Sequence, residues 1–130
     1  MPEREAISTD RAPAAVGAYS QAIRAGDLVF TAGQLGIDPA SGEFVAPDVA
    51  GQAEQALANL AAILEASASG LDRLVKVTVL LADIADWPAL NDVYARVIPK
   101  PYPARSAFAV KDLPKGARIE IEAIAIVGHG

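Results

Sequence analysis

Cysteine is absent from this sequence of 130 residues, and histidine occurs once, at His129. The lack of cysteine excludes disulfide bonds, thiolate catalysis and zinc ribbons. A single histidine excludes a metal site built from several histidines, and its place near the end of the chain predicts a solvated side chain. Any chemistry must therefore come from carboxylates, arginines, tyrosines or backbone groups.

A surplus of basic residues is also missing, because 11 lysines and arginines stand against 16 aspartates and glutamates, a net charge of −5. Nucleic-acid partners usually require a basic face. The first residues contain no apolar stretch typical of a secretory signal. The longest apolar run, 74–85, is too short to span a bilayer and contains Lys76 and Asp83. We therefore expect no nucleic-acid partner, no membrane partner and a cytoplasmic location.

Apolar residues are abundant, at 52% against 21% charged, which is typical of a folded domain. A chain of this length buries roughly two-thirds of its extended surface, enough for a core without metal or disulfide staples. We expect one domain over 1–130. Residues 1–15 are polar and rich in proline and alanine, so we expect them to lie over the surface or fray.

Turn residues and periodicity divide the rest of the chain. Two short apolar runs around Ala25-Gly26-Asp27 predict a β-hairpin. Apolar spacings of three and four predict two amphipathic helices, one capped by Asp48 and the other capped by Asp86 and stopped at Pro99. Alternating apolar residues predict strands at 73–82, 104–111 and 117–127, the first with Val75, Val77, Val79 and Leu81 on one face.

The expected order is β-β-α-β-α-β-β, an α+β domain with two helices packed on one face of a mixed sheet. Alternation in the last strand leaves Ile124 and Ile126 on the face that the helices do not cover. An uncovered apolar face of this kind is usually buried against another subunit. The pattern therefore predicts a homo-oligomer.

Two segments depart from the local pattern. Arg105 opens an otherwise small and apolar strand, and arginine is suited to binding a carboxylate or phosphate through two hydrogen bonds. Glu120 and Glu122 share a face with Ile124, and apolar surroundings favour the acid form of a carboxyl group, as a general acid or base needs. The alternative for Arg105 is a solvated side chain at a strand end. The alternative for Glu120 and Glu122 is that they are the solvent-facing residues of an alternating strand. The pattern alone favours both alternatives.

Other candidate side chains carry little information individually. No serine lies in a nucleophile elbow with a histidine base, and Gly33-Gln34-Leu35-Gly36 lacks the lysine of a phosphate loop. Asn91 and Tyr94 lie one turn apart on the second predicted helix, where Tyr94 suits the core. Tyr19, in the predicted hairpin, is equally weak on its own.

Four stretches together carry the motifs of a known family: Gly17-Ala18-Tyr19-Ser20-Gln21-Ala22, Phe30-Thr31-Ala32-Gly33-Gln34, Tyr102-Pro103-Ala104-Arg105-Ser106 and Ile119-Glu120-Ile121-Glu122-Ala123-Ile124-Ala125. With the Asn-x-x-Tyr of Asn91 and Tyr94, they resemble the RidA (YjgF-type) family of reactive-intermediate deaminases. The resemblance covers nearly the whole chain. It implies a chorismate-mutase-like α+β fold and a homotrimer with active sites between subunits.

The resemblance also implies an activity, the hydrolysis of 2-imino and enamine acids to 2-keto acids and ammonia without a cofactor. It implies that Arg105 binds the substrate carboxylate and that Glu120 positions the attacking water. The remaining positions that match the family's pocket are Tyr19, Gly33, Asn91 and, through its backbone, Ala107.

Three alanines depart from the family pattern. Ala107 stands where many relatives have cysteine, Ala32 replaces a common serine, and Ala18 replaces a frequent proline. None of the three changes Arg105 or Glu120, so substrate preference is more in question than activity.

Other functions stay open at this point. The same fold can serve as a non-catalytic trimeric module that binds small acids or acts like a chaperone. A ribonuclease activity has been attached to the family, but the net charge of −5 and the lack of a paired histidine catalyst argue against it. Chorismate-mutase activity ranks last, because Arg105 is the one arginine in the matched motifs.

Overall fold

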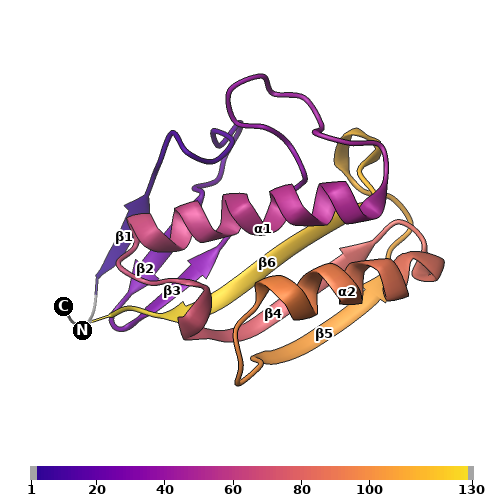
Figure 1. Ribbon diagram of the computed structural model, residues 1–130. Coiled ribbons are helices and arrows are strands. Elements are labelled where there is room, and N and C mark those ends of the chain that lie inside the picture. The colour runs from indigo at the N-terminus through magenta and orange to yellow at the C-terminus, as the bar shows by residue number, and fades with distance from the viewer. Residues whose placement is uncertain (1–2, 129–130) are drawn as a thin grey trace.

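The computed structural model describes residues 3–128, so His129 lies outside the described residues. Figure 1 shows two α-helices in front of a six-stranded sheet. The elements are β1 (Arg4–Ile7), β2 (Ala22–Ala25), β3 (Leu28–Thr31), α1 (Val49–Ala66), β4 (Leu74–Leu81), α2 (Trp87–Val97), β5 (Ala104–Ala109) and β6 (Ile119–Ile126). Over this range no helix is both long and apolar enough to cross a lipid bilayer.

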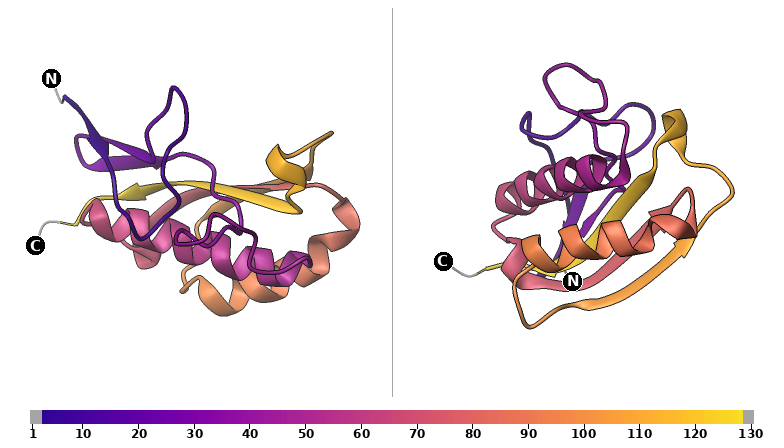
Figure 2. Two further views of the ribbon diagram at one scale, coloured as in Figure 1. Left: turned by 90° about the horizontal axis from the view of Figure 1, so that it is seen from above. Right: turned by 45° about the vertical axis from the view of Figure 1, so that its right-hand side comes forward.

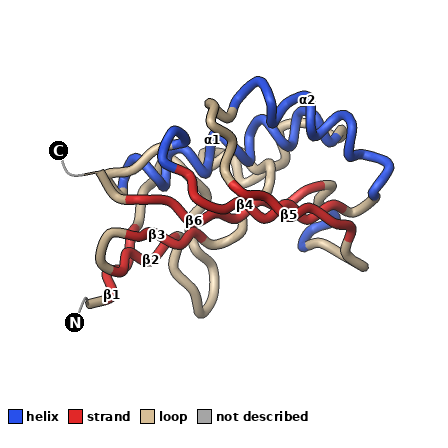
Figure 3. Tube along the Cα trace, turned by 90° about the horizontal axis from the view of Figure 1, so that it is seen from below, coloured by secondary structure: helices blue, strands red, loops and turns tan. Residues whose placement is uncertain are grey.

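The strands lie in the order β1-β2-β3-β6-β4-β5, and β4 and β5 form the parallel pair in an otherwise antiparallel sheet. Both helices lie on the same side of the sheet (Figures 2 and 3). The expected α+β class, with two helices on one face of a mixed sheet, is confirmed. The fully buried side chains between the layers include Leu57, Leu60, Ile63, Leu64, Val77, Val79, Leu81, Ile119 and Ile121.

Helix α1 begins as its sequence predicts. The carboxylate of Asp48 accepts a hydrogen bond from the backbone N–H of Gly51 at 3.2 Å, which pairs a donor that the first turn leaves free. Further along the helix the buried side chain of Asn59 donates to the carbonyl oxygens of Leu35 and Ile37, at 3.1 and 2.9 Å. This residue therefore fixes the loop that follows β3 against the helix.

One strand was not predicted from the sequence, and one predicted helix cap is wrong. Residues 4–7, expected to lie over the surface or fray, form the edge strand β1 with Ile7 buried, because their backbone pairs with β2. Asp86 precedes α2 but does not cap it through its side chain. Its carboxylate instead accepts two hydrogen bonds from Arg118, at 3.1 and 2.7 Å, because a charged donor is a stronger partner than a backbone N–H.

Strand β4 differs from a regular strand at its start. A register shift between Leu74 and Lys76 in the pairing with β6 breaks the alternation there. Val77, Val79 and Leu81 are buried as predicted, whereas Val75 is 41% exposed.

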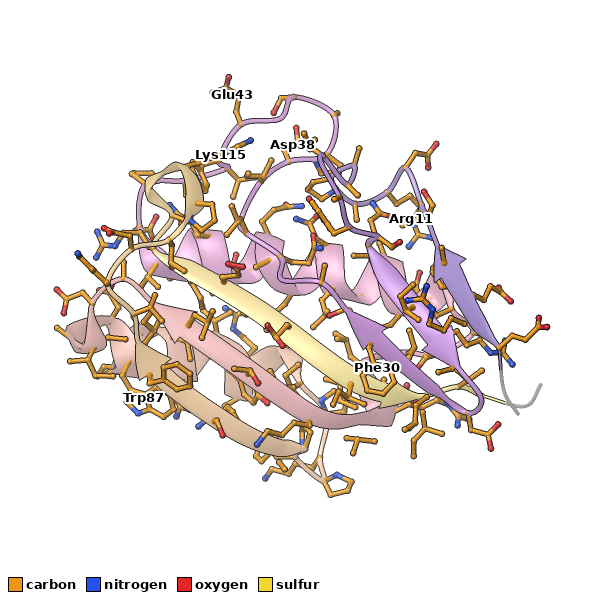
Figure 4. The ribbon with its side chains drawn as sticks, turned by 180° about the vertical axis from the view of Figure 1, so that it is seen from behind. Arg11, Phe30, Asp38, Glu43, Trp87 and Lys115 are labelled. Carbon is orange, nitrogen blue, oxygen red and sulfur yellow. The ribbon has the colours of Figure 1, made fainter. Side chains whose placement is uncertain are left out.

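The face of the sheet away from the helices has apolar side chains open to solvent (Figure 4, where Phe30 is labelled). Pairing of β3 with β6 places Leu28 opposite Ile126 and Phe30 opposite Ile124 on this face. Leu28, Phe30 and Ile126 are 38%, 41% and 44% exposed. The expected uncovered apolar face is thus present.

Candidate active site

Arg105 lies on the helix-covered side of the sheet, on the edge strand β5. The register pairs it with the buried Val77 of β4, so its side chain extends toward α2. There its guanidinium carbon lies 4.5 Å from the ring centroids of both Trp87 and Tyr94. Spacings of four and three place Trp87, Asn91 and Tyr94 on one face of α2, and the Asn91 amide oxygen accepts a 3.0 Å hydrogen bond from Arg105.

The Arg105 guanidinium keeps donors available for a ligand. Among residues 3–128, the arginines in ion pairs are Arg11, Arg96 and Arg118, and Arg105 has no carboxylate within that range. Its neighbours line a cavity of about 320 Å³: Asn91, Tyr94, Ala95, Tyr102 and Pro103. A partly buried cation held between two rings beside a cavity can bind one carboxylate through two hydrogen bonds.

Tyr94 is buried in the core, as its position predicted, but it also contributes to the Arg105 cavity. Burial raises the pKa of its hydroxyl, and the positive charge of Arg105 opposes that rise. The hydroxyl has no hydrogen-bond partner among the described residues. The ring, rather than the hydroxyl, is therefore what Tyr94 offers to Arg105.

Glu120 lies on the opposite side of the sheet. The register of β6 pairs it with Leu80 of β4, on the face that the helices do not cover. Burial raises the pKa of its carboxyl group, and the negative charge of Glu122, two residues along the same face, raises it further. A carboxyl group with a raised pKa is a better proton acceptor than an ordinary glutamate, which suits general acid–base chemistry.

Gly33 leaves the space that Glu120 occupies. Gln34 exchanges two backbone hydrogen bonds with Ile121, at 2.8 and 3.0 Å, which fixes the segment after β3 beside β6. A Cβ atom at position 33 would overlap the carboxyl group of Glu120. Both residues line a second cavity of about 590 Å³, whose other polar side chains are those of Tyr19, Gln34 and Lys115.

Another wall of this second cavity comes from the segment before β2. The side chain of Gln21 is buried, accepts a 2.7 Å hydrogen bond from the N–H of Thr9 and donates to the carbonyls of Thr9 and Pro13 at 3.0 and 2.8 Å. Pro13 and Ala14 line the cavity. Gln21 is therefore a positioning residue for this wall.

The residues expected to form one site lie around two separate cavities of the chain, which we call half-sites. Arg105 and Asn91 line one cavity, whereas Tyr19, Gly33 and Glu120 line the other. Arg105 pairs with Val77 and Glu120 with Leu80, an odd separation along β4, so the two side chains lie on opposite faces. Ala107 shares the face of Arg105 and lies beside a third recess.

Within residues 3–128 no three carboxylate or histidine side chains lie close enough together to hold a metal ion. The half-sites offer an arginine, an amide, a phenol and a carboxyl group, and these groups suit the binding of a small organic acid and the movement of protons.

Residues 9–127 match the family described as Endoribonuclease L-PSP. The chain belongs to this family. The 2-iminobutanoate/2-iminopropanoate deaminase of Bos taurus is 51% identical over 125 residues, which are 96% of this chain and 91% of the relative. The sequence resemblance to the RidA (YjgF-type) family is confirmed.

Solved structures of the L-PSP family have the same fold. A structure from Entamoeba histolytica, described as a putative endoribonuclease L-PSP, has a TM-score of 0.94 at 42% identity and covers 96% of this chain and 100% of its own. E. coli TdcF with bound serine has a TM-score of 0.90 at 39% identity, with coverage of 95% and 99%.

Three residues of the candidate half-sites were not predicted from the sequence: Trp87, Gln21 and Lys115. Trp87 was detectable, because its spacing from Asn91 and Tyr94 marks one helix face. Gln21 lies in one of the family motifs, but its side chain is buried and forms hydrogen bonds to residues 8 to 12 positions away in the sequence. Lys115 enters the Glu120 cavity from the loop before β6, which no local pattern indicates.

Proposed function

We propose that this protein hydrolyses 2-imino acids and their enamine tautomers to 2-keto acids and ammonia. Its relatives from Bos taurus and Homo sapiens, 51% and 48% identical, are named 2-iminobutanoate/2-iminopropanoate deaminases. The observation that carries the proposal is the Arg105 guanidinium, which lies between two rings beside a cavity and has no carboxylate partner among the described residues.

Arg105 is proposed to bind the substrate carboxylate. One of its N–H groups is held by Asn91 and two rings lie close to the guanidinium carbon, so the remaining N–H groups are left to bind a carboxylate. This arrangement fixes the acid and so orients the adjacent C=N bond for attack.

Glu120 is proposed to transfer the protons. It takes a proton from water while the water oxygen bonds to the imine carbon, and it passes this proton to the imine nitrogen, giving a neutral carbinolamine. It then takes the hydroxyl proton of the carbinolamine as the C=O bond forms and the C–N bond breaks, and it delivers this proton to the departing nitrogen, which leaves as ammonia. The net reaction consumes one water and needs no redox partner. The raised pKa of Glu120 supports this role, because it makes the carboxylate a better proton acceptor than an ordinary glutamate.

We further propose that the two half-sites meet between copies of this chain, in a homo-oligomer that the family resemblance makes a trimer. The placement of Arg105 and Glu120 on opposite faces of one sheet supports this arrangement. So does the exposed apolar face that surrounds the Glu120 strand. A substrate held by Arg105 of one copy would then face Glu120, Tyr19 and Gly33 of its neighbour.

The activity is tested with an imine generated in situ by an amino-acid oxidase, with semicarbazide trapping what survives. Wild type should accelerate imine loss, Arg105→Ala should lower kcat/KM by about 100-fold or more, and Glu120→Gln by roughly 10²–10⁴-fold. Arg96→Ala and Glu65→Gln, which alter exposed ion pairs, are the matched controls and should stay near wild type. Binding of a 2-keto acid with no imine loss in wild type would instead indicate a binding module.

The shared site is tested by mixing. Arg105→Ala and Glu120→Gln chains, unfolded and refolded together in equal amounts, should regain activity, because about a quarter of the interfaces would pair two intact halves. Each variant refolded alone should stay inactive. No recovery in correctly sized mixed oligomers would place both residues in a site within one chain.

A further inference from the structure

An apolar recess lies beside Arg105 on β5 and the start of α2. Its volume is about 520 Å³, and its lining residues are Ile84, Ala85, Trp87, Pro88 and Ala107. None of these side chains carries a charge or a hydroxyl group. Trp87 joins the recess to the Arg105 half-site, because its ring also lies 4.5 Å from the guanidinium carbon. Figure 4 shows Trp87 beside β5, the outer strand of the sheet.

The recess exists because the residue at position 107 is small. Ala107 follows Arg105 by two positions on β5, so both side chains lie on the same face. The 3₁₀ turn Ile84–Asp86 forms the other side, with Ile84 56% exposed. A larger side chain at position 107 would occupy the space between β5 and this turn.

The acidic residues of the turn are held by other groups. Asp83 accepts a 2.9 Å hydrogen bond from the N–H of Ala85, and Asp86 is paired with Arg118. Neither lines the recess. A polar or acidic group placed there would lose hydration and meet a mostly apolar lining without a charged partner, whereas an apolar group would gain contact with Ile84 and Trp87.

We propose that the recess binds the side chain of the substrate, so that the protein prefers 2-imino acids with branched aliphatic or aromatic side chains. This inference rests on the proposed imine hydrolysis. With its carboxylate on Arg105, a 2-imino acid has its side chain two bonds from the carboxylate carbon, and the recess follows Arg105 along the same face of β5, beside Trp87. The imine derived from alanine would leave the recess nearly empty, and the imine derived from glutamate would place a negative charge in it.

The preference is measured as kcat/KM for imines made in situ from alanine, leucine, phenylalanine and glutamate. Wild type should favour the leucine and phenylalanine imines over the alanine imine by about tenfold or more, the discrimination typical of a few methylene groups. The glutamate imine should be the poorest substrate. Calorimetric Kd values for pyruvate, 4-methyl-2-oxopentanoate and phenylpyruvate should follow the same order and do not depend on turnover.

Two variants connect the preference to the recess. Ala107→Leu fills it and should lower the leucine-to-alanine ratio of kcat/KM by roughly tenfold. Ile84→Thr replaces an exposed apolar wall with a hydroxyl, carries little risk to folding, and should lower the same ratio several-fold. Ala58→Leu, the same substitution as at position 107 but on the exposed face of α1, is the matched control and should leave the ratio unchanged.

The possible results test binding in the recess and the proposed reaction separately. Wild type that hydrolyses alanine and glutamate imines as well as leucine imine, or variants that leave the ratio at its wild-type value, would overturn the inference while the proposed function stands. Wild type that accelerates no imine would overturn the proposed function. The Kd order of the three keto acids then decides independently whether the recess binds apolar side chains.

Discussion

Glycine at position 33 is required by the carboxyl group that lies against its backbone. Because a Cβ atom there would overlap Glu120, Gly33→Ala must displace that side chain or shift the strand-like segment beside β6. We expect Gly33→Ala to destabilise the fold by roughly 1–3 kcal/mol, the usual range for overpacking, and to lower kcat/KM. Chemical denaturation and the imine assay measure the two effects.

The control is the same Gly33→Ala substitution made in a Glu120→Ala protein, which lacks the carboxyl atoms that the new Cβ would overlap. In that background Gly33→Ala should cost less than about 0.5 kcal/mol, so the two substitutions should be strongly non-additive. Equal costs in both backgrounds would mean that Gly33 is needed for some reason other than Glu120.

Glu122 raises the pKa of Glu120 and should in this way affect the proposed reaction. That pKa is raised first by burial and then by the charge of Glu122. If Glu120 acts as its base form, kcat/KM rises with pH as the carboxyl group loses its proton. Removing the like charge in Glu122→Gln lowers the pKa, so the acidic limb of the profile should move to lower pH. Glu65→Gln, an exposed carboxylate on α1, should leave the limb in place.

At the scale of elements, one face of α2 determines how Arg105 is held. Trp87, Asn91 and Tyr94 meet the guanidinium because their spacings of four and three match the helical repeat. We expect Tyr94→Leu to raise KM about twofold to fivefold more than Tyr94→Phe does, since Phe keeps the ring and a cation–π contact contributes roughly 0.5–1 kcal/mol. Tyr94→Phe should not lower stability, because the hydroxyl it removes is unpaired.

Comparison of these two variants by KM and by denaturation separates stacking from packing. If Tyr94→Phe weakens substrate binding as much as Tyr94→Leu, the hydroxyl rather than the ring would be the functional group. If both variants bind substrate like wild type, the ring is only part of the core.

Elements governed by local patterns were predictable from the sequence. Helix α1 begins at its Asp48 cap, and the β2–β3 hairpin turns at Gly26, because both depend on neighbouring residues. Predictions were incomplete or wrong where a residue distant in the sequence determines the local structure. Asp86 turns away from its helix toward Arg118, and residues 4–7 become a strand through pairing with β2.

The half-sites show the same limit. Arg105 and Glu120 were identifiable as unusual residues in their strands, and family motifs drew attention to them. Their placement on opposite faces follows from the register of β4 with both β5 and β6, which no single segment encodes. Burial of Gln21 likewise depends on the segment that folds back over it.

At the scale of the whole molecule, the proposed shared site makes the uncovered sheet face important for both association and activity. Leu28, Phe30 and Ile126 expose large apolar side chains on the same face that carries Glu120. Burial of such a face against a second copy would remove this area from water and bring a neighbouring chain toward Glu120. Association and catalysis should therefore be lost together.

Ile126→Glu tests this coupling. A carboxylate buried in an apolar interface would lack a partner, so the variant should shift the protein to monomer at micromolar concentration, as light scattering after gel filtration would show. Its kcat/KM should fall by at least about tenfold, although Ile126 lines neither half-site cavity and Arg105 keeps its contacts to α2. Val45→Glu, which puts the same charge on an exposed apolar residue of the loop before α1, should leave both size and activity unchanged. A fully active Ile126→Glu monomer would show that one chain completes the site, and Arg105 and Glu120 could not then act on one substrate from opposite faces of the sheet.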